Sequence, residues 1–213
     1  MKKPENAQSP VALDKRSLII ETARLHLRRF GEDRMTITGI ARALGMSHAN
    51  IYRYFPGKTA IVEAVLDRWL SRVEALIGEL AGRDGTAAER IEAVVIELHR
   101  RRRAKFKQEP ELYESFRRVI VSRSDAVARR QEAIGAVFAM LIRQGIEDGE
   151  FQPVDPVEAA TLLDDATAFF LHPAVMPSSA LDNCGEERAR KVVRHMLAGF
   201  AVPAESLLAQ QPA

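Results

Sequence analysis

Along most of the chain, apolar residues recur at every third or fourth position, which is the spacing of one face of an α-helix. Sustained alternation of apolar and polar residues, the mark of a half-buried strand, is scarce. The first helix is predicted from a cap at Asp14 or Ser17 through Phe30, because Gly31 favours a stop there. The pattern therefore predicts an all-α chain.

Two short helical runs follow, and each has a hydroxyl residue just before it. Thr36 and Ser47 can each accept a hydrogen bond from an amide of the next turn, so they mark two helix starts. Between the runs, Gly45 can adopt the positive φ that a sharp connection needs. The facing apolar stripes consist of Ile37, Ile40, Ala41 and Leu44 on the first helix and Ile51 and Phe55 on the second. This layout is that of a helix-turn-helix.

The second of these helices keeps its polar residues off the apolar stripe. His48, Asn50, Arg53 and Tyr54 offer imidazole, carboxamide, guanidinium and phenol groups. Such groups suit hydrogen bonds to base edges and phosphates in a major groove. The pair of helices therefore predicts DNA binding.

Further helices are predicted over residues 58–82, 86–108, 109–120, 124–149, 155–172 and 186–200, separated by glycine and proline. The last two carry apolar stripes, which include Val193, Met196, Leu197 and Phe200. These stripes can pair with a second copy in a four-helix interface, or they can complete the core of one chain.

The helix-turn-helix region resembles a known family in its residues and their spacing. The matching positions lie between Leu18 and Val65: Ala23, Leu27, Gly31, Thr36-Ile37, Ile40-Ala41, Gly45-Met46-Ser47, Ile51-Tyr52, Tyr54-Phe55 and Lys58. In these positions the chain is similar to the tetracycline-repressor-like (TetR) family of bacterial regulators. The resemblance implies a homodimeric repressor of a palindromic DNA operator, released by a small-molecule effector.

The resemblance also divides the chain and assigns roles to residues. It implies a flexible arm at 1–12, a three-helix DNA-binding domain at 13–57, and a helical effector-binding and dimerisation domain at 58–207. Phosphate contacts are expected from Thr36, Tyr52, Tyr54 and Lys58, and groove contacts from Arg42, Ser47, His48 and Asn50, with His48 and Asn50 reading bases. The chain departs from the family at Gly39, where an acidic residue is usual, so the capping box is lost and a weaker helix is expected.

Charge is distributed as this division predicts. The net charge is only +2, but residues 1–70 hold 12 Lys and Arg against 7 Asp and Glu, while the remainder holds 19 against 22. The basic end is the end that carries the motif. A single cysteine, Cys184, excludes an intramolecular disulfide, and no apolar run reaches the ~20 residues of a membrane span. We therefore expect a cytoplasmic protein without a membrane partner.

Other features have ordinary alternatives. The basic run Arg100–Arg103, with Lys105 and Lys107, is expected to be a solvated helix face rather than a second nucleic-acid site. His99, His172 and His195 lack the spacing of a metal motif, so no metal or other cofactor is expected. An effector pocket is predicted from aromatic residues that are also typical of any helical core: Trp69, Phe106, Tyr113, Phe116, Phe138 and Phe169.

Two other classes of function are considered beside the ligand-released repressor. An enzyme would need a phosphate-binding glycine loop, a nucleophile elbow or a zinc motif, and none is present in the sequence. A DNA-binding protein without any effector, such as a constitutive repressor, is the main alternative that the sequence leaves open.

Overall fold

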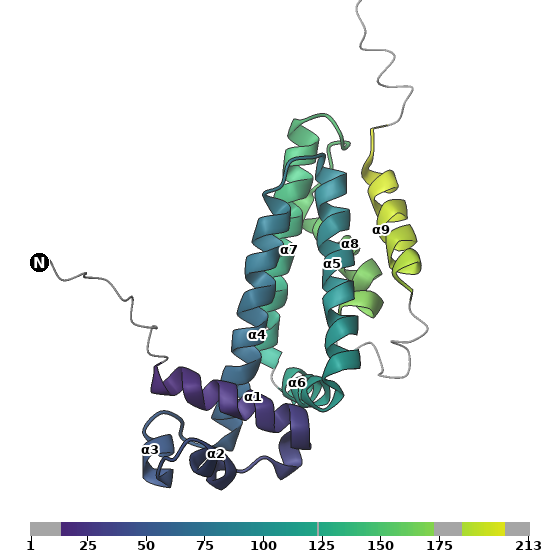
Figure 1. Cartoon of the computed structure of the whole chain (residues 1–213). Coiled ribbons are helices and arrows are strands. Elements are labelled where there is room, and N and C mark those ends of the chain that lie inside the picture. The colour runs from purple at the N-terminus through teal and green to yellow at the C-terminus, as the bar shows by residue number, and fades with distance from the viewer. Residues whose placement is uncertain (1–13, 123, 173–184, 203–213) are drawn as a thin grey trace, which may run out of the picture.

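The computed structural model describes residues 14–122, 124–172 and 185–202, and within these ranges the regular elements are all helices (Figure 1). The all-α prediction is confirmed. The helices are α1 (Lys15–Arg34), α2 (Ile37–Ala43), α3 (His48–Tyr52), α4 (Lys58–Ala81), α5 (Ala87–Gln108), α6 (Pro110–Ser122), α7 (Ser124–Glu147), α8 (Pro156–Leu171) and α9 (Glu186–Phe200). The predicted arm at 1–12 and Cys184 lie outside the described residues.

Helix α1 begins and breaks at residues that the sequence marks. The Asp14 side chain accepts a hydrogen bond from the Arg16 amide at 3.2 Å, as a capping residue does. Gly31 adopts a φ of 71° inside the helical span, so the predicted break is present. A further turn follows it, and α1 ends at Arg34 rather than at Phe30.

The helices bury two apolar cores, and α4 and α6 contribute side chains to both. Helices α1, α2, α3 and the first half of α4 enclose the lower core, and α4, α5, α7, α8 and α9 form the upper bundle (Figure 1). Helix α6 lies between them: Leu112 and Phe116 are buried in the lower core, whereas Tyr113 is buried in the upper one. A movement of α6 therefore disturbs both cores.

The apolar stripes of the last two helices are used inside the single chain. Val193, Leu197 and Phe200 are buried in the upper core, and Met196 packs against it. Of the two alternatives that the sequence leaves open for this stripe, the structure supports the second, the core of one chain, because α5 and α8 pack against this face of α9. Apolar side chains left exposed on α8 are instead Val157 and Leu162, at 62% and 49% exposure.

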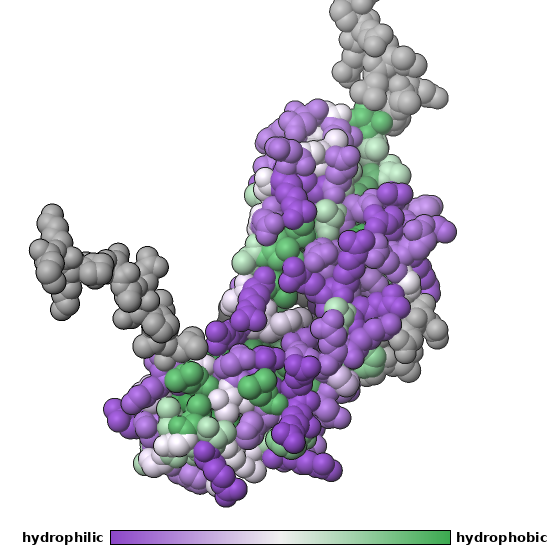
Figure 2. All heavy atoms as spheres, in the orientation of Figure 1, coloured by the Kyte–Doolittle hydropathy of each residue, from purple (hydrophilic) through white to green (hydrophobic). Residues whose placement is uncertain are grey.

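The face of the molecule shown in Figure 2 is mostly polar. In the view of Figure 2, hydrophilic residues cover most of the bundle, and smaller hydrophobic areas lie on the N-terminal helices and along the bundle. Among the described helices, none combines the length and apolar character needed to cross a bilayer.

Candidate nucleic-acid interface

Helices α2 and α3 are capped as their sequence predicts. Thr36 Oγ1 accepts a hydrogen bond from the Gly39 amide at 3.0 Å, and Ser47 Oγ accepts one from the Asn50 amide at 3.2 Å. Gly45 in the connecting turn has a φ of 61°. These contacts form within a few residues, so they fix where α2 and α3 begin and where the chain turns between them.

Helix α3 presents its polar residues on the side opposite its anchor. Ile51 is completely buried in the lower core, which turns the other face of this short helix outward. On that face His48 is exposed and Asn50 is half-buried, and Arg42 of α2 is also exposed. Figure 1 shows α2 and α3 at the end of the molecule farthest from the C-terminal end of α9. The predicted base-reading residues are therefore accessible.

Residues that flank α3 offer groups for phosphate contacts. Tyr52 is 53% exposed, whereas Tyr54 is half-buried and packs against the lower core. Lys58 is the first residue of α4, and the preceding Gly57 has no side chain to cap that helix. The first amides of α4 and the Lys58 ammonium are both suited to bind an anion there. Three of the four predicted phosphate contacts thus lie along the connection from α3 to α4, and the fourth, Thr36, caps α2.

The packing of α2 against α1 explains the glycine at position 39, which the sequence alone did not explain. A Cβ atom at this position would lie 3.2 Å from Cε1 of His26 on α1 and 3.2 Å from Oγ1 of Thr36. The loss of the capping box is confirmed, because α2 has no acidic residue in its first turn. Glycine at this position therefore allows α2 to lie close to the His26 ring.

A buried carboxylate connects the N-terminal helices, which hold the helix-turn-helix, to the bundle. Glu109, at the junction of α5 and α6, is 8% exposed. It accepts a hydrogen bond from Nη1 of Arg24 at 2.8 Å and lies 3.6 Å from Nε of Arg28, both on α1. It also pairs with Lys105 of α5. Sequence analysis missed this contact, since its partners on α1 lie about 85 residues away along the chain.

The six aromatic residues predicted to line a pocket fall into two groups. Trp69 and Phe116 pack against each other, with ring centroids 5.4 Å apart, at the lower core. Phe106 and Tyr113 meet edge-to-face at 5.6 Å in the upper core, to which Phe138 and Phe169 also belong. Only the second group lies within the bundle.

The arginines of the basic run on α5 lie in different environments. Arg100 binds Glu186 on α9 through two hydrogen bonds of 2.7 Å, and Arg101 binds Glu97 at 3.0 Å. The expectation of a solvated face is wrong for Arg102 and Arg103, because Nη1 of the first and Nε of the second are buried without a hydrogen-bond partner among the described residues. Burial lowers the pKa of Arg102 to about 10.

No group of three His, Cys, Asp or Glu residues within the described ranges is arranged to hold a metal ion. The Nδ1 of His195 donates to the Lys191 carbonyl at 2.8 Å, and the Nδ1 of His99 lies 3.4 Å from the Phe170 carbonyl. These two rings therefore have backbone carbonyl partners, one within α9 and one on α8.

Comparison with protein families matches both halves of the chain. Residues 19–65 match the family described as "Bacterial regulatory proteins, tetR family", and residues 87–193 match "Tetracyclin repressor-like, C-terminal domain". The second match covers about half of the 213 residues.

Individual proteins share parts of the chain or its fold. The nucleoid occlusion factor SlmA of Actinobacillus pleuropneumoniae is 34% identical over 74 residues, which are 33% of this chain and 37% of SlmA. The HTH-type transcriptional repressor KstR of Mycolicibacterium smegmatis is 23% identical over 137 residues, 64% of this chain and 65% of KstR. The chain thus spans about a third to two thirds of the length of these relatives.

A solved structure with a similar fold is that of SmeT, the repressor of the Stenotrophomonas maltophilia multidrug efflux pump SmeDEF. It has a TM-score of 0.66 at 16% identity, covering 90% of this chain and 93% of SmeT. A complex of SmeT with triclosan gives a TM-score of 0.65 at 17% identity, covering 89% and 92% of the two chains.

Proposed function

Because this chain belongs to the TetR family of bacterial transcriptional regulators, we propose that it is a homodimeric repressor that binds a palindromic operator and is released by a small molecule. The observation that carries the DNA-binding half is the exposed polar face of α3, beside the uncapped start of α4. Family membership indicates a transcription factor rather than an enzyme. We expect the protein in the cytoplasm, because the operator DNA on which such a regulator acts lies there.

In the proposed complex, α3 enters the major groove and its flanks hold the backbone. His48 and Asn50 contact base edges, with Ser47 and Arg42 beside them, while the phosphates are held by Thr36, Tyr52, Tyr54 and Lys58. Two copies related by a two-fold axis would place their α3 helices in successive major grooves, roughly 34 Å apart. An inverted repeat follows from that symmetry.

The first experiment is selection of bound duplexes from a random-sequence DNA pool at near-physiological salt, where non-specific binding is weak. Enrichment of one inverted repeat supports both sequence reading and two-fold docking. Enrichment of a single half-site would contradict the dimer, and no enrichment would contradict sequence-specific binding.

On the selected operator, Asn50→Ala tests base reading. Loss of a bidentate contact should weaken binding by about 1 to 3 kcal/mol and relax the preference at one base pair. Unchanged affinity on every single-base variant of the operator would remove Asn50 from the base-reading set.

Lys58→Ala tests the phosphate contact. It should weaken binding to all sequences alike and reduce the slope of log K against log salt by about one unit. Arg83→Ala is the matched control, because it removes one positive charge from the opposite end of α4. Equal slopes for the two variants would show that Lys58 contacts no phosphate.

We place the dimer contact on the exposed apolar side chains of α8, Val157 and Leu162, since the stripes of α9 are buried within the chain. Leu162→Glu should produce monomers in sedimentation velocity and weaken operator binding. Met140→Glu is a control on α7, where an apolar side chain is 39% exposed. A dimer that survives Leu162→Glu would move the interface elsewhere.

Release by an effector is proposed from the family and from the aromatic group in the upper core, Phe106, Tyr113, Phe138 and Phe169. An effector that binds the folded protein raises its melting temperature. If it prefers the conformation that does not bind DNA, it also lowers the affinity for the operator, and the operator lowers the affinity for the effector by the same factor. A constitutive repressor would show operator binding that no small molecule changes.

A further inference from the structure

Among the side-chain atoms of the described bundle that are buried without a hydrogen bond, two lie on neighbouring helices. Nη1 of Arg102 on α5 and Oη of Tyr113 on α6 are both shielded from solvent and have no partner among the described residues. Tyr113 is only 2% exposed. Buried polar groups are almost always paired, because leaving one unpaired costs free energy. Two such groups on neighbouring helices therefore call for a missing partner.

The two groups interact electrostatically with each other and with a small set of neighbours. Burial lowers the pKa of Arg102, while Tyr113 and Asp164 favour its charged form. Burial also raises the pKa of Tyr113, and the Arg102 guanidinium opposes that change. His172, at the end of α8, has a pKa lowered by burial and then by Arg102. At neutral pH the cluster thus holds a cation and a neutral phenol, with one carboxylate near them.

Aromatic side chains surround this cluster. His99 and Phe106 lie three and four residues from Arg102 on α5, so helical spacing puts all three on one face. The Phe106 ring meets Tyr113, and the His99 ring meets Phe170 of α8 edge-to-face at 6.0 Å. A ligand that reaches Arg102 would therefore have apolar surface beside its charged end.

We propose that Arg102 and Tyr113 bind the carboxylate of an organic acid whose apolar body packs among Phe106, Phe170 and their neighbours. This proposal rests on the proposed function, in which a small molecule releases the repressor. A guanidinium and a phenol both donate hydrogen bonds, and a carboxylate accepts from both at once. A neutral apolar molecule would leave both donors unpaired. The ligand class is thus an amphipathic organic anion.

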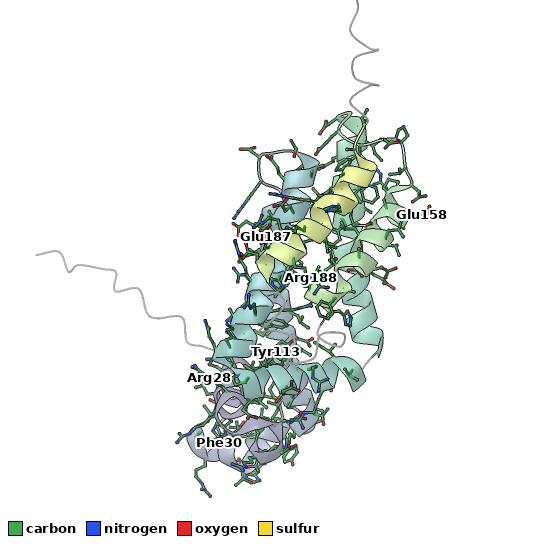
Figure 3. All side chains as sticks on the ribbon, turned by 90° about the vertical axis from the view of Figure 1, so that its right-hand side faces the viewer. Arg28, Phe30, Tyr113, Glu158, Glu187 and Arg188 are labelled. Carbon is green, nitrogen blue, oxygen red and sulfur yellow. The ribbon has the colours of Figure 1, made fainter. Side chains whose placement is uncertain are left out.

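The position of Tyr113 links this site to the DNA-reading domain. Its amide donates to the Glu109 carbonyl at 2.9 Å, one turn before it, and the Glu109 side chain holds Arg24 of α1. Figure 3 shows Tyr113 at the base of the bundle, above Arg28 and Phe30 of α1. An acid that draws Tyr113 towards Arg102 acts on the helix whose other face lies in the lower core.

The test measures the melting temperature of the full chain with decanoate and 2-naphthoate, each against its neutral alcohol, 1-decanol and 2-naphthylmethanol. We expect at least one acid to raise the melting temperature more than its alcohol does. Arg102→Met and Tyr113→Phe should reduce that difference, with Arg102→Met abolishing it. Arg101→Gln, which changes an exposed arginine one position earlier, should leave it intact. The proposal is overturned if no acid exceeds its alcohol or if Arg102→Met responds like the wild type.

A second measurement needs no ligand. Replacing a guanidinium whose Nη1 is buried without a hydrogen bond by an apolar side chain of similar length should raise the melting temperature of the ligand-free protein by about 2 to 10 °C. An unchanged or lower value would show that Arg102 already has a partner, and would also overturn the proposal. Operator binding is measured separately for each variant. Wild-type protein that binds the acid but no DNA contradicts the repressor function, whereas one that binds DNA but no acid contradicts only this site.

Discussion

Removal of the Glu109 charge should loosen the connection between the DNA-reading domain and the bundle. In Glu109→Gln, the amide keeps the shape of the side chain, but Arg24 and Lys105 lose a charged partner in a buried position. A hydrogen bond to a charged group stabilises by about 1.5 to 3 kcal/mol and a neutral one by about 0.5 to 1.5 kcal/mol, so each contact loses about 1 kcal/mol or more.

Two details refine the magnitude. Arg24 keeps Glu21, which accepts from its Nε at 2.9 Å and its Nη2 at 2.8 Å, and this limits the loss on α1. Lys105, whose side chain is only 16% exposed, has less access to water to replace its partner. Together we expect a loss of about 2 to 3 kcal/mol, which for a chain of this size lowers the melting temperature by about 4 to 12 °C.

The assay is differential scanning calorimetry of the full chain, with Glu79→Gln as the matched control. Glu79 also pairs with an arginine, Arg83 at 3.0 Å, but its side chain is 65% exposed, so its loss should cost less than about 1 kcal/mol. If Glu109→Gln lowers the melting temperature no more than Glu79→Gln does, the buried pairs at the α5–α6 junction do not stabilise the fold as reasoned here.

Two further predictions concern the bundle. Gly145→Ala should destabilise the fold by about 1 to 3 kcal/mol, because the new Cβ would clash with the buried Phe151 ring. Gly78→Ala on α4 has open space around it and should stabilise the fold by about 0.5 to 1 kcal/mol. Chemical denaturation measures both free energies of unfolding, and two changes of the same sign would contradict the packing. Arg100, followed by Arg190, lowers the pKa of Glu186 from 4.5 to about 2, so its contribution to stability is present above pH 4.5 and is lost as the pH falls towards 2. The melting temperature of Glu186→Gln should therefore be below that of the wild type at pH 6 and approach it towards pH 3, and a gap that does not change with pH would disprove the assignment.

Much of the DNA-reading domain could be predicted from the sequence, because its defining contacts are local. The caps at Thr36 and Ser47 bond amides three residues away, and Gly45 supplies the positive φ of the turn. The residues expected at the DNA are accessible on α3 and at the start of α4 for the same reason. Helix boundaries in the bundle followed from similar local signals, such as Asp155 before Pro156.

The tertiary structure decided what no local pattern contains. Whether a charged side chain on a helix faces water or the interior depends on which helices pack against it, so Arg102 and Arg101, adjacent in sequence, have opposite environments. The same holds for Glu109, whose partners on α1 come from the other end of the chain, and for the stripe of α9, which one chain covers by itself. The sequence alone determined the helices and the identity of the DNA reader, because hydrogen bonds between near neighbours specify them. Packing between distant segments determined which charged side chains are buried. It therefore also determined where the proposed ligand would bind and through which helix its binding would affect the DNA-binding domain.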